Sequence, residues 1–400
     1  MKEYRCQVVI AGAGPVGTVM ATLLAGAGID TVLLEAGQTC AEDLRASTFH
    51  PPTLELLDQI GITSTLLERG LKAPVYHWRD RQSGEAIEFD LSELSDVTRY
   101  PFRVQCEQYH LSRALSDGLE NAVNASVRFG TRLLSFKQDD TGVTVFAEGA
   151  TAIERFRCDW LIGADGANSL VRKWLGVEFD GFTYPEKFLC LTTKTELSDH
   201  LPNLALVNYV SDPQEWLVLL RVPSLWRVLV PANENLSDDE LRSDAMTQAI
   251  FDRLIGNGKS VQTEHRTLYS VHQRVAKTFV KGRVILIGDS AHLNNPLGGF
   301  GMNSGVHDAF SLFDEIEPVI NAGAGADRIA RFERRRRTVT HSFTQAQTIQ
   351  NMEYIKVGSS AAHAKRRADM EAIRADDVKR RAYLMRQAMF DSLAQAAEIN

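Results

Sequence analysis

Val8-Val9-Ile10-Ala11-Gly12-Ala13-Gly14-Pro15-Val16-Gly17 is the stretch that decides the fold of this chain. A short β-branched run enters a glycine loop, and the residues after the loop have helical spacing up to Gly28. A second apolar strand is predicted over 31–35, and it ends in Glu35. The order strand, Gly-x-Gly-x-x-Gly, helix, strand and acid is typical of a dinucleotide-binding site.

Each glycine of this loop has its own part in that interpretation. Gly12 permits the tight turn, Gly14 lets a pyrophosphate approach the backbone, and Gly17 lets helix and strand pack closely. The helix N-terminus offers unpaired N–H groups and a partial positive charge to phosphates. Glu35 lies 18 residues after Gly17, where its carboxylate can accept hydrogen bonds from both hydroxyls of an adenosine ribose. The same carboxylate disfavours a 2′-phosphate, so NADP is not expected at this site.

The composition is that of an ordinary globular protein of two or three domains. The chain has 400 residues, of which 44% are hydrophobic, and its formal net charge of −7 argues against a general nucleic-acid binder. The five cysteines form no Cys-x-x-Cys pair, so we expect reduced thiols and no metal site. The glycine loop begins at residue 12 without a signal peptide, and no apolar run is long enough to span a bilayer. These features predict a cytoplasmic protein that does not associate with a membrane.

The middle of the chain predicts a second, antiparallel domain. Residues 75–91 have the pattern of a hairpin, and 185–280 contain short β-rich runs separated by proline and polar turns. One amphipathic helix is expected over 238–255, with Ser237 as its N-cap. The expected fold class is α/β (α+β): a Rossmann-like domain with an inserted antiparallel-sheet domain and a helical C-terminal tail. The expected ranges are 1–74, 98–180 and 281–340 for the first domain, 75–97 and 181–280 for the second, and 341–400 for the tail.

Two later stretches have the same order of elements as the first: a strand, a turn with glycine and the start of a helix. In the stretch that begins at Cys158, an apolar strand runs into Asp165-Gly166, a turn that could equally be a plain hairpin turn or a helix entry. Another strand ends at Gly288-Asp289, and a proline–glycine loop then leads to a helix from about Asn303. Two such constructions suit one extended ligand with a pyrophosphate at one end and an electron-rich ring at the other.

Two further residues are candidate contacts with that ligand. Gln105 is polar where a buried strand should end, and is either a ligand contact or a cap. Arg45 is either a contact with phosphate or ribose or a surface arginine.

With these motifs in this order, residues from about Val8 to Arg337 resemble the class A FAD-dependent aromatic hydroxylases, flavoprotein monooxygenases with the para-hydroxybenzoate hydroxylase fold. The resemblance implies FAD as cofactor, with Asp165-Gly166 serving both FAD and NAD(P)H and Asp289 contacting the ribityl chain. It also implies that Gly301-Met302-Asn303 faces the N1/O2 edge of the flavin. The implied FAD-binding residues are Gly12, Gly14, Pro15, Val16, Gly17, Glu35, Ala36, Arg45, Gln105, Asp165, Gly288, Asp289, Pro296, Gly299, Gly301, Met302 and Asn303.

The chain departs from the family pattern near the flavin ring. The usual Pro-Pro after the histidine of the third motif is Asn295-Pro296 here, and the usual Gly-Gln-Gly is Gly299-Phe300-Gly301. No Trp-x-Trp-x-Ile signature is present, which disfavours the halogenase branch.

The resemblance implies hydroxylation of a phenolic or related small aromatic molecule with NAD(P)H and O₂, through a C4a-hydroperoxyflavin. Because the chain has a single dinucleotide loop, NAD(P)H is expected to bind transiently as a co-substrate. Deprotonation activates a phenol, and the candidate groups for it are His50, Tyr184, Tyr209 and His272, while Pro296 is expected to form a wall against the flavin ring. A flavin-dependent dehydrogenase or reductase and a flavin-binding redox sensor are the alternatives. The helical C-terminal tail is a candidate surface for forming a homodimer.

Overall fold

A computed structural model describes residues 2–42, 46–256, 258–259, 261–325, 327–356 and 358–400. In this part of the chain, the central sheet has the strand order β19-β20-β13-β2-β3-β9, and all its pairs are parallel except β19–β20. Its strands are β2 (Val8–Ala11), β3 (Thr31–Leu34), β9 (Ala125–Arg128), β13 (Trp160–Gly163), β19 (Val280–Lys281) and β20 (Val284–Leu286). The predicted mixed α/β fold with a Rossmann-like sheet is confirmed.

Helices cover the central sheet because its strands are apolar on both faces, as parallel strands usually are. The helix α1 (Pro15–Gly26) packs against both α4 (Gln108–Leu119) and α8 (Phe300–Ala322). The helix α8 begins at Phe300, three residues before the expected start at Asn303. Shorter elements around this layer are α2 (Pro51–Asp58), α3 (Thr63–Arg69), α5 (Leu170–Leu175) and the three-stranded sheet β4 (Thr48–Phe49), β8 (Arg103–Gln105) and β5 (Leu71–Ala73).

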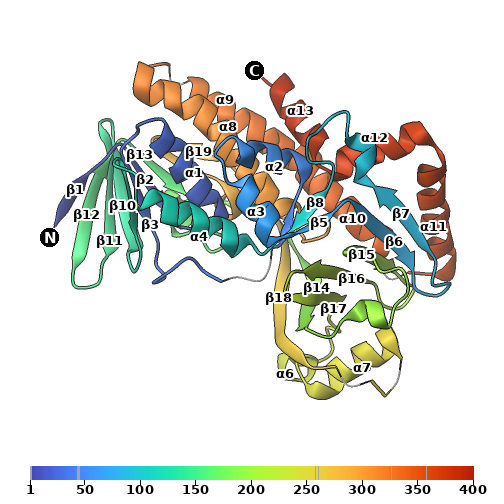
Figure 1. Ribbon diagram of the computed structural model, residues 1–400. Helices are drawn as coiled ribbons and strands as arrows, with labels where there is room; N and C mark the ends of the chain where they lie inside the picture. Colours follow the sequence, from blue (N-terminus) through green and yellow to red (C-terminus); the bar gives the residue numbers. More distant parts are fainter. Residues whose placement is uncertain (1, 43–45, 257, 260, 326, 357) are drawn as a thin grey trace.

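Two further sheets lie at opposite ends of the molecule (Figure 1). The four-stranded sheet beside the N-terminus consists of β1 (Glu3–Arg5), β10 (Arg132–Asp139), β11 (Gly142–Glu148) and β12 (Ile153–Cys158). The eight-stranded sheet has the order β21-β18-β14-β17-β16-β15-β6-β7. Its strands are β6 (Val75–Asp80), β7 (Ala86–Asp90), β14 (Phe179–Thr193), β15 (Val207–Ser211), β16 (Leu217–Val222), β17 (Leu225–Pro231), β18 (Thr263–Ala276) and β21 (His292–Leu293).

The eight-stranded sheet joins segments that are distant in the sequence. The hairpin predicted at 75–91 is present as β6–β7, and β6 pairs in parallel with β15. The remaining pairs of this sheet are antiparallel. The inserted antiparallel sheet expected from the sequence is thus confirmed, while the exact domain boundaries stay a prediction.

The single helix expected over 238–255 is wrong, because two helices occupy this range. They are α6 (Asp238–Leu241) and α7 (Asp244–Ile255). Ser237 caps the first in a capping box with Glu240, as expected of an N-cap. Ser243 interrupts the helix, since its hydroxyl donates to the carbonyl of Glu240 and accepts from the backbone N–H of Met246.

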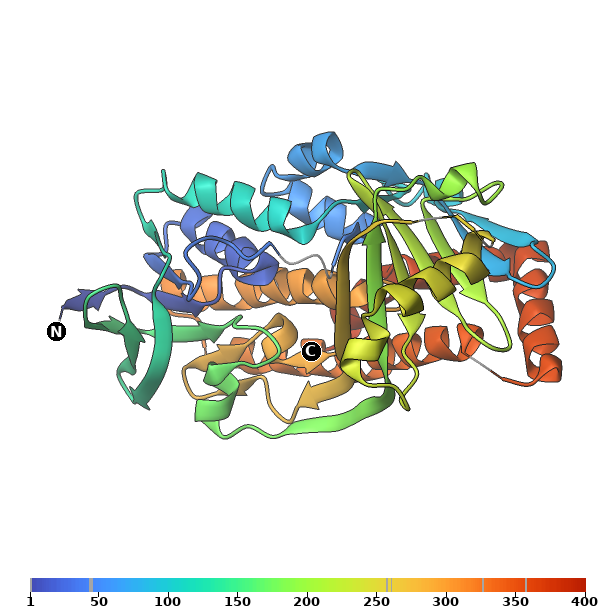
Figure 2. The same ribbon diagram turned by 90° about the horizontal axis from the view of Figure 1, so that it is seen from below.

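The C-terminal segment is helical, and its helices α11 (Ser360–Ala375) and α12 (Asp377–Gln387) pack on the hairpin β6–β7 and the turn after it (Figures 1 and 2). It comprises α9 (Asp327–Val339), a π-helical turn (Thr340–Gln345), α10 (Ala346–Ile355), α11 (Ser360–Ala375), α12 (Asp377–Gln387) and α13 (Phe390–Glu398). Met370 and Leu384 are fully buried in one apolar cluster with Trp78 and Phe89 of the hairpin. The tail therefore completes the core of the eight-stranded sheet. Every helix in the described ranges is too short or too polar to cross a membrane.

Replacement of Leu384 tests this packing. Leu384→Ala should destabilise the protein by about 2–5 kcal/mol, because it removes buried methyl groups and leaves a cavity between α12 and the hairpin. Val378→Ala on the same helix is the matched control: Val378 is 80% exposed, so its truncation should change stability by no more than about 0.5 kcal/mol. Urea unfolding of the two variants measures the difference, and equal stabilities would contradict a packed C-terminal segment.

Candidate active site

The three glycine motifs meet because their strands are neighbours in the central sheet. Gly163 at the end of β13 lies opposite Ala11 of β2 on one side and Leu286 of β20 on the other. Carboxyl ends of parallel strands share one edge of a sheet, so the loops that follow these strands converge. The Gly12–Gly17 loop, Asp165-Gly166 and Gly288-Asp289 accordingly stand side by side.

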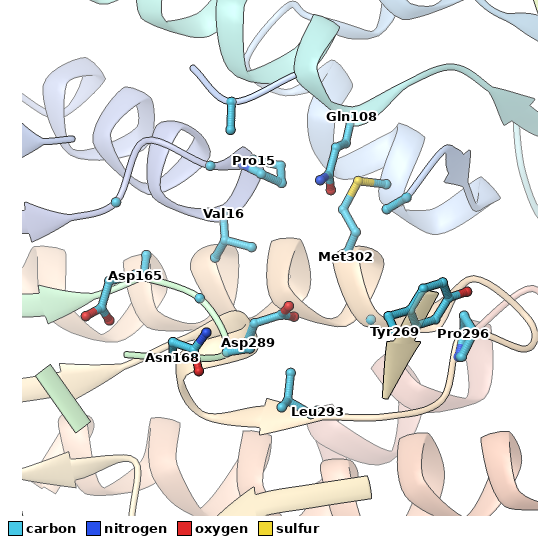
Figure 3. Close-up of a pocket in the computed structure, with 18 of the residues that line it drawn as sticks. Pro15, Val16, Gln108, Asp165, Asn168, Tyr269, Asp289, Leu293, Pro296 and Met302 are labelled. Atoms are coloured by element: carbon cyan, nitrogen blue, oxygen red, sulfur yellow. The ribbon is translucent and has the colours of Figure 1, made fainter. Parts of the chain in front are cut away.

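One cavity of about 640 Å³ runs along these loops and on to the eight-stranded sheet. Figure 3 shows Pro15, Val16 and Asp165 toward one end of it and Tyr269 and Pro296 at the other. We call these the nucleotide end and the ring end. Because the cavity continues from the nucleotide end to the ring end, it can accommodate an extended ligand.

At the nucleotide end, each glycine meets a different constraint. Gly12 has φ of +101°, and a Cβ there would lie 2.5 Å from the carbonyl oxygen of Ala164. A Cβ at Gly17 would lie 1.9 Å from the carbonyl oxygen of Gly12. Gly14 has an ordinary φ of −73°, and a Cβ there would meet no described heavy atom within 4 Å. Gly12 and Gly17 are therefore required by the protein itself, whereas the space in front of Gly14 is open for a ligand.

The start of α1 fits an anion. Pro15 is its first residue, no side chain of the described residues caps it, and no acidic residue lies in its first turn. The free backbone N–H groups there face the space in front of Gly14, which is the arrangement that binds a pyrophosphate. The residues present thus fit the diphosphate of FAD.

Glu35 is oriented by two backbone hydrogen bonds. Its Oε2 accepts from the N–H of Ala13 at 2.9 Å and its Oε1 from the N–H of Gly37 at 2.8 Å. Glu35 and Ala36 both line the cavity. Because a carboxylate oxygen accepts more than one hydrogen bond, Glu35 can still bind ribose hydroxyls.

The two aspartates of the later motifs differ in orientation. The Asp165 carboxylate accepts from the Ser169 hydroxyl at 2.5 Å and from the N–H of Val171 at 3.0 Å, so it caps α5. Burial raises the pKa of Asp165, while these hydrogen bonds lower it. Asp289 is exposed to the cavity and points into it in Figure 3. Asp289 is thus placed to bind the hydroxyls of a ribityl chain.

At the ring end, α8 points its N-terminus at the cavity. Gly299 precedes this helix with φ of +73°, and Gly301 and Met302 line the cavity. Asn303 lies behind them: its Oδ1 accepts from the N–H of His50, and its Nδ2 donates to the carbonyl of Gly299 at 2.6 Å. Asn303 therefore shapes the loop rather than lining the cavity.

A fully buried charged group supports the Gly288-Asp289 loop from behind. Asp308 accepts from His292 Nε2 at 2.7 Å, from Arg336 Nε at 2.7 Å and from the N–H of Gly288 at 3.0 Å. Its pKa is about 2 because the attraction of His292 and Arg336 outweighs the effect of burial, which on its own raises the pKa. The Asp308 carboxylate thus fixes the loop by charge-assisted hydrogen bonds.

Most of the FAD-binding residues expected from the resemblance line the cavity. They are Gly12, Gly14, Pro15, Val16, Glu35, Ala36, Asp165, Asp289, Pro296, Gly299, Gly301 and Met302. Gly17, Gly288 and Asn303 lie directly behind this lining and shape its loops. Arg45 lies outside the described residues.

Gln105 stays a predicted FAD contact, and its buried Nε2 has no hydrogen-bond partner among the described residues. Gln105 is fully buried on β8, where its Oε1 accepts from the Thr48 hydroxyl at 3.0 Å, and it lies outside the cavity lining. Gln108, the first residue of α4, lines the cavity instead. Leu111 and Leu115 follow Gln108 at three and seven positions and are buried, so helical spacing places Gln108 on the inward face of α4. This helical spacing is the sequence signal that could have identified Gln108 as a residue that lines the cavity.

The candidate catalytic residues separate into two groups. Tyr209 on β15, His272 on β18 and Pro296 line the cavity at the ring end. His50 does not: it is fully buried, it lies 2.7 Å through Nε2 from the carbonyl oxygen of Gly298, and burial holds its pKa well below the usual value. Tyr184 also lies outside the lining, and its hydroxyl accepts from Asn295 Nδ2. Neither His50 nor Tyr184 therefore faces the cavity directly.

The ring end has further walls that the sequence did not identify. The eight-stranded sheet contributes the apolar side chains Val218, Leu220, Leu229 and Val271, together with Cys190, Arg227 and Tyr269. Arg227 is buried and donates to the Ser47 hydroxyl at 3.2 Å. The walls are thus mainly apolar, with a few polar groups that can orient a ring.

Among the described residues, one Cys–Glu–His group has ligand atoms close enough for a metal: Cys106, Glu107 and His110. Arg69 donates to His110 Nδ1 at 3.2 Å, and burial raises the pKa of Cys106 to about 12. A guanidinium neighbour and a protonated thiol both oppose cation binding.

Comparison with known proteins identifies a matching family, similar sequences and a similar solved structure. Residues 5–347 match the family model described as FAD binding domain. The chain is 33% identical over 359 residues to para-nitrophenol 4-monooxygenase of Pseudomonas sp. strain WBC-3, covering 88% of each chain. It is 34% identical over 333 residues to 6-hydroxy-3-succinoylpyridine 3-monooxygenase of Pseudomonas putida strain S16, covering 83% of this chain and 84% of the relative. The crystal structure of p-nitrophenol 4-monooxygenase from Pseudomonas putida DLL-E4 superposes with a TM-score of 0.92 at 30% identity, covering 98% of this chain and 99% of that one.

His307 predicts a pH dependence of stability. It lies beside Asp308 on α8, its Nε2 is 2.9 Å from the Thr53 hydroxyl, and burial lowers its pKa from 6.5 to about 3. Because the unfolded chain binds this proton more readily, the contribution of neutral His307 to stability is complete above pH 6.5 and is lost as the pH falls toward 3. His307→Gln should make the loss of stability between pH 7 and pH 5 shallower, by up to about 1.4 kcal/mol per pH unit. The exposed His265→Gln is the control; urea unfolding at several pH values should give it the slope of the parent protein.

Gly14→Glu tests the nucleotide end. A side chain and a negative charge would occupy the space in front of Gly14, so the variant should fold without retaining FAD. Gly26→Glu at the exposed far end of α1 is the matched control and should keep the flavin. Visible absorbance of the purified proteins measures bound FAD, and full flavin content in Gly14→Glu would refute the assignment of this loop.

Proposed function

The chain belongs to the class A FAD-dependent aromatic hydroxylases, and we propose that it hydroxylates a small phenol or hydroxypyridine with O₂ and NAD(P)H as co-substrates. In this reaction one oxygen atom of O₂ enters the ring and the other leaves as water. Where the attacked carbon carries hydrogen, that hydrogen leaves as a proton; where it carries a nitro group, as at position 4 of para-nitrophenol, nitrite leaves and the ring product is a quinone. NAD(P)H supplies the two electrons that balance the reaction. FAD supplies the redox and oxygen-activating chemistry when it is bound.

One observation carries the proposal: the nucleotide end and the ring end are parts of one cavity. The start of α1, Glu35 and Asp289 can bind the diphosphate and the two sugar chains of FAD. The start of α8, with Gly301 and Met302, then meets the flavin ring, where its N–H groups stabilise negative charge. Beyond the ring, the sheet residues enclose a space for an aromatic substrate.

The residues at the ring end support chemistry on a phenol. Apolar side chains such as Leu220 and Leu229 exclude water, which limits loss of the activated oxygen. A phenol has a pKa near 10, so a hydrogen-bond partner that accepts or relays its proton raises its reactivity. Tyr209 has a hydroxyl for this role. Burial and the charge of Arg274 lower the pKa of His272, which favours the neutral imidazole, the form that can accept a proton.

The relatives narrow the class of substrate. Their names refer to para-nitrophenol and to a hydroxypyridine, each a single ring with a hydroxyl and an electron-withdrawing group. The mainly apolar ring end with a few polar groups suits such a ring. We therefore place para-nitrophenol first among substrates to test.

The nicotinamide co-substrate has no glycine-rich dinucleotide loop of its own, so we propose a transient encounter with the flavin. All five cysteines are free thiols, which supports a reducing compartment such as the cytoplasm. A homodimer stays a prediction.

The main alternative is a flavin-dependent dehydrogenase on the same scaffold. It differs in the fate of oxygen, because a dehydrogenase inserts none into the product. Incubation with ¹⁸O₂, NAD(P)H and para-nitrophenol or other phenols, followed by mass spectrometry, distinguishes the two. A hydroxylase incorporates one labelled atom per product, whereas an unlabelled product would overturn the proposal.

Tyr209→Phe tests the role of the cavity tyrosine. Removing the hydroxyl should lower kcat for phenol hydroxylation about 100-fold, in the range of a lost acid–base group, while bound FAD is unchanged. Tyr354→Phe is the matched control, since Tyr354 lies on α10 outside the cavity lining. Steady-state rates across pH 6–9 give the comparison, and a parental rate in Tyr209→Phe would remove this residue from the mechanism.

A further inference from the structure

The loop that brings Pro296 to the ring end is held from its far side by buried polar side chains. We call Gln273, Asn295, Gln345 and Thr348 the polar clamp; all four are buried. They come from β18, from the loop itself, from the end of the π-helical turn and from α10. Two other parts of the chain, β18 and residues 345–348, thus meet behind the loop of residues 293–297.

The polar clamp binds the loop backbone at successive points. Gln345 Nε2 donates to the carbonyl of Leu293 at 2.8 Å. The N–H of Asn295 donates to Gln273 Oε1 at 2.9 Å. Asn295 Oδ1 accepts from the N–H of Leu297 at 3.1 Å. The backbone on both sides of Pro296 is therefore fixed by hydrogen bonds.

The members of the polar clamp also bind one another. Asn295 Nδ2 donates to the Thr348 carbonyl at 2.9 Å. Gln273 Nε2 donates to the Thr348 hydroxyl at 2.8 Å and to the Gln345 carbonyl at 3.2 Å. The result is a connected network of buried side chains, where each hydrogen bond is strong and a lost partner is costly. The π-helical turn belongs to this network, and such turns often mark functional sites.

Asn295 stands where the family that the chain resembles usually has the first of two prolines. A proline fixes its own φ covalently and has no N–H, so it could not donate to Gln273. In this chain the rigidity of the loop must come from hydrogen bonds instead. Those bonds reach α10, and they tie the loop to the C-terminal segment.

We propose that Asn295 is a positioning residue that holds Pro296 against the flavin ring through the polar clamp. The inference rests on the proposed hydroxylation, because its consequence is the efficiency of oxygen transfer. A displacement of about 1 Å at a reacting centre can cost about 100-fold in rate. A loose loop would let activated oxygen escape as hydrogen peroxide before it meets the substrate.

The experiment compares Asn295→Ala and Thr348→Val with the parent protein. Asn295→Ala removes the side-chain bonds of the loop, whereas Thr348→Val keeps the volume and removes only one hydroxyl. Gln350→Ala is the matched control, because Gln350 lies on the exposed face of the same helix. The circular dichroism of the bound flavin, recorded without substrate, reports the surroundings of the ring. The ratio of hydroxylated product to NAD(P)H consumed reports coupling.

We expect both clamp variants to change the flavin spectrum and Gln350→Ala to leave it unchanged. The product ratio should fall about threefold or more in Asn295→Ala, and less in Thr348→Val, with hydrogen peroxide making up the difference. FAD affinity should stay near that of the parent, because the nucleotide end is untouched. If Asn295→Ala does not fold, Thr348→Val decides the question.

Parental spectra and parental product ratios in the folded clamp variants would overturn the inference. Failure of the proposed function has a different signature. In that case the parent itself forms no hydroxylated phenol, and the flavin spectrum still judges the polar clamp.

Discussion

The site depends on one constraint: β20, β13 and β2 are parallel neighbours, so they end at the same edge of the sheet. Each strand ends in a turn that only a small residue or glycine allows, and a helical turn follows each time. The backbone N–H of Ala164 donates to the carbonyl of Ala11, and that of Ile287 to the carbonyl of Gly163. These bonds keep the three loops in register. A ligand that spans the loops therefore meets backbone groups whose positions the sheet has already set.

Buried charge stabilises the same edge from behind. Asp308 on α8 joins the Gly288 turn, His292 of β21 and Arg336 of α9, and so connects three different elements. The neighbouring arginines of α9 are also paired. Glu315, nearly inaccessible, accepts from both Arg331 and Arg335. An unpaired charge at such a depth would cost several kcal/mol, so each of these groups requires its partners.

The ring end is assembled from more distant parts. The hairpin β6–β7 extends a sheet whose other strands lie after residue 178, and the C-terminal helices cover its apolar side. Ion pairs also join the C-terminal helices to this sheet: Arg380 pairs with Glu93, and Arg367 pairs with Asp80. The C-terminal segment thereby contributes both to the core of the eight-stranded sheet and, through α10, to the hydrogen bonds behind Pro296. This arrangement places the conformation of the flavin-side loop under the control of residues that never touch the cavity.

The sequence by itself determined the features that depend on neighbours along the chain. The glycine loop, the β-branched strands, the hairpin and the cap at Ser237 follow from local backbone preferences and spacing, and the order of the motifs identified the family. Local signals were weaker where a residue has two local options. Ser243, for example, is a tolerable helix residue by spacing, yet its hydroxyl ends one helix and begins another.

Only the tertiary structure decided which side chains reach the cavity. Gln105 and Gln108 are both polar residues near the start of α4, but the first points into the core and the second into the cavity. His50 has the chemistry of a base, but it is fully buried and lies against the carbonyl oxygen of Gly298. Arg336 is one of four successive arginines, Arg334–Arg337, yet it is buried, because α8 supplies a buried carboxylate for it. In each case the outcome depends on a partner hundreds of residues away or on the packing of another element, and no local pattern carries that information.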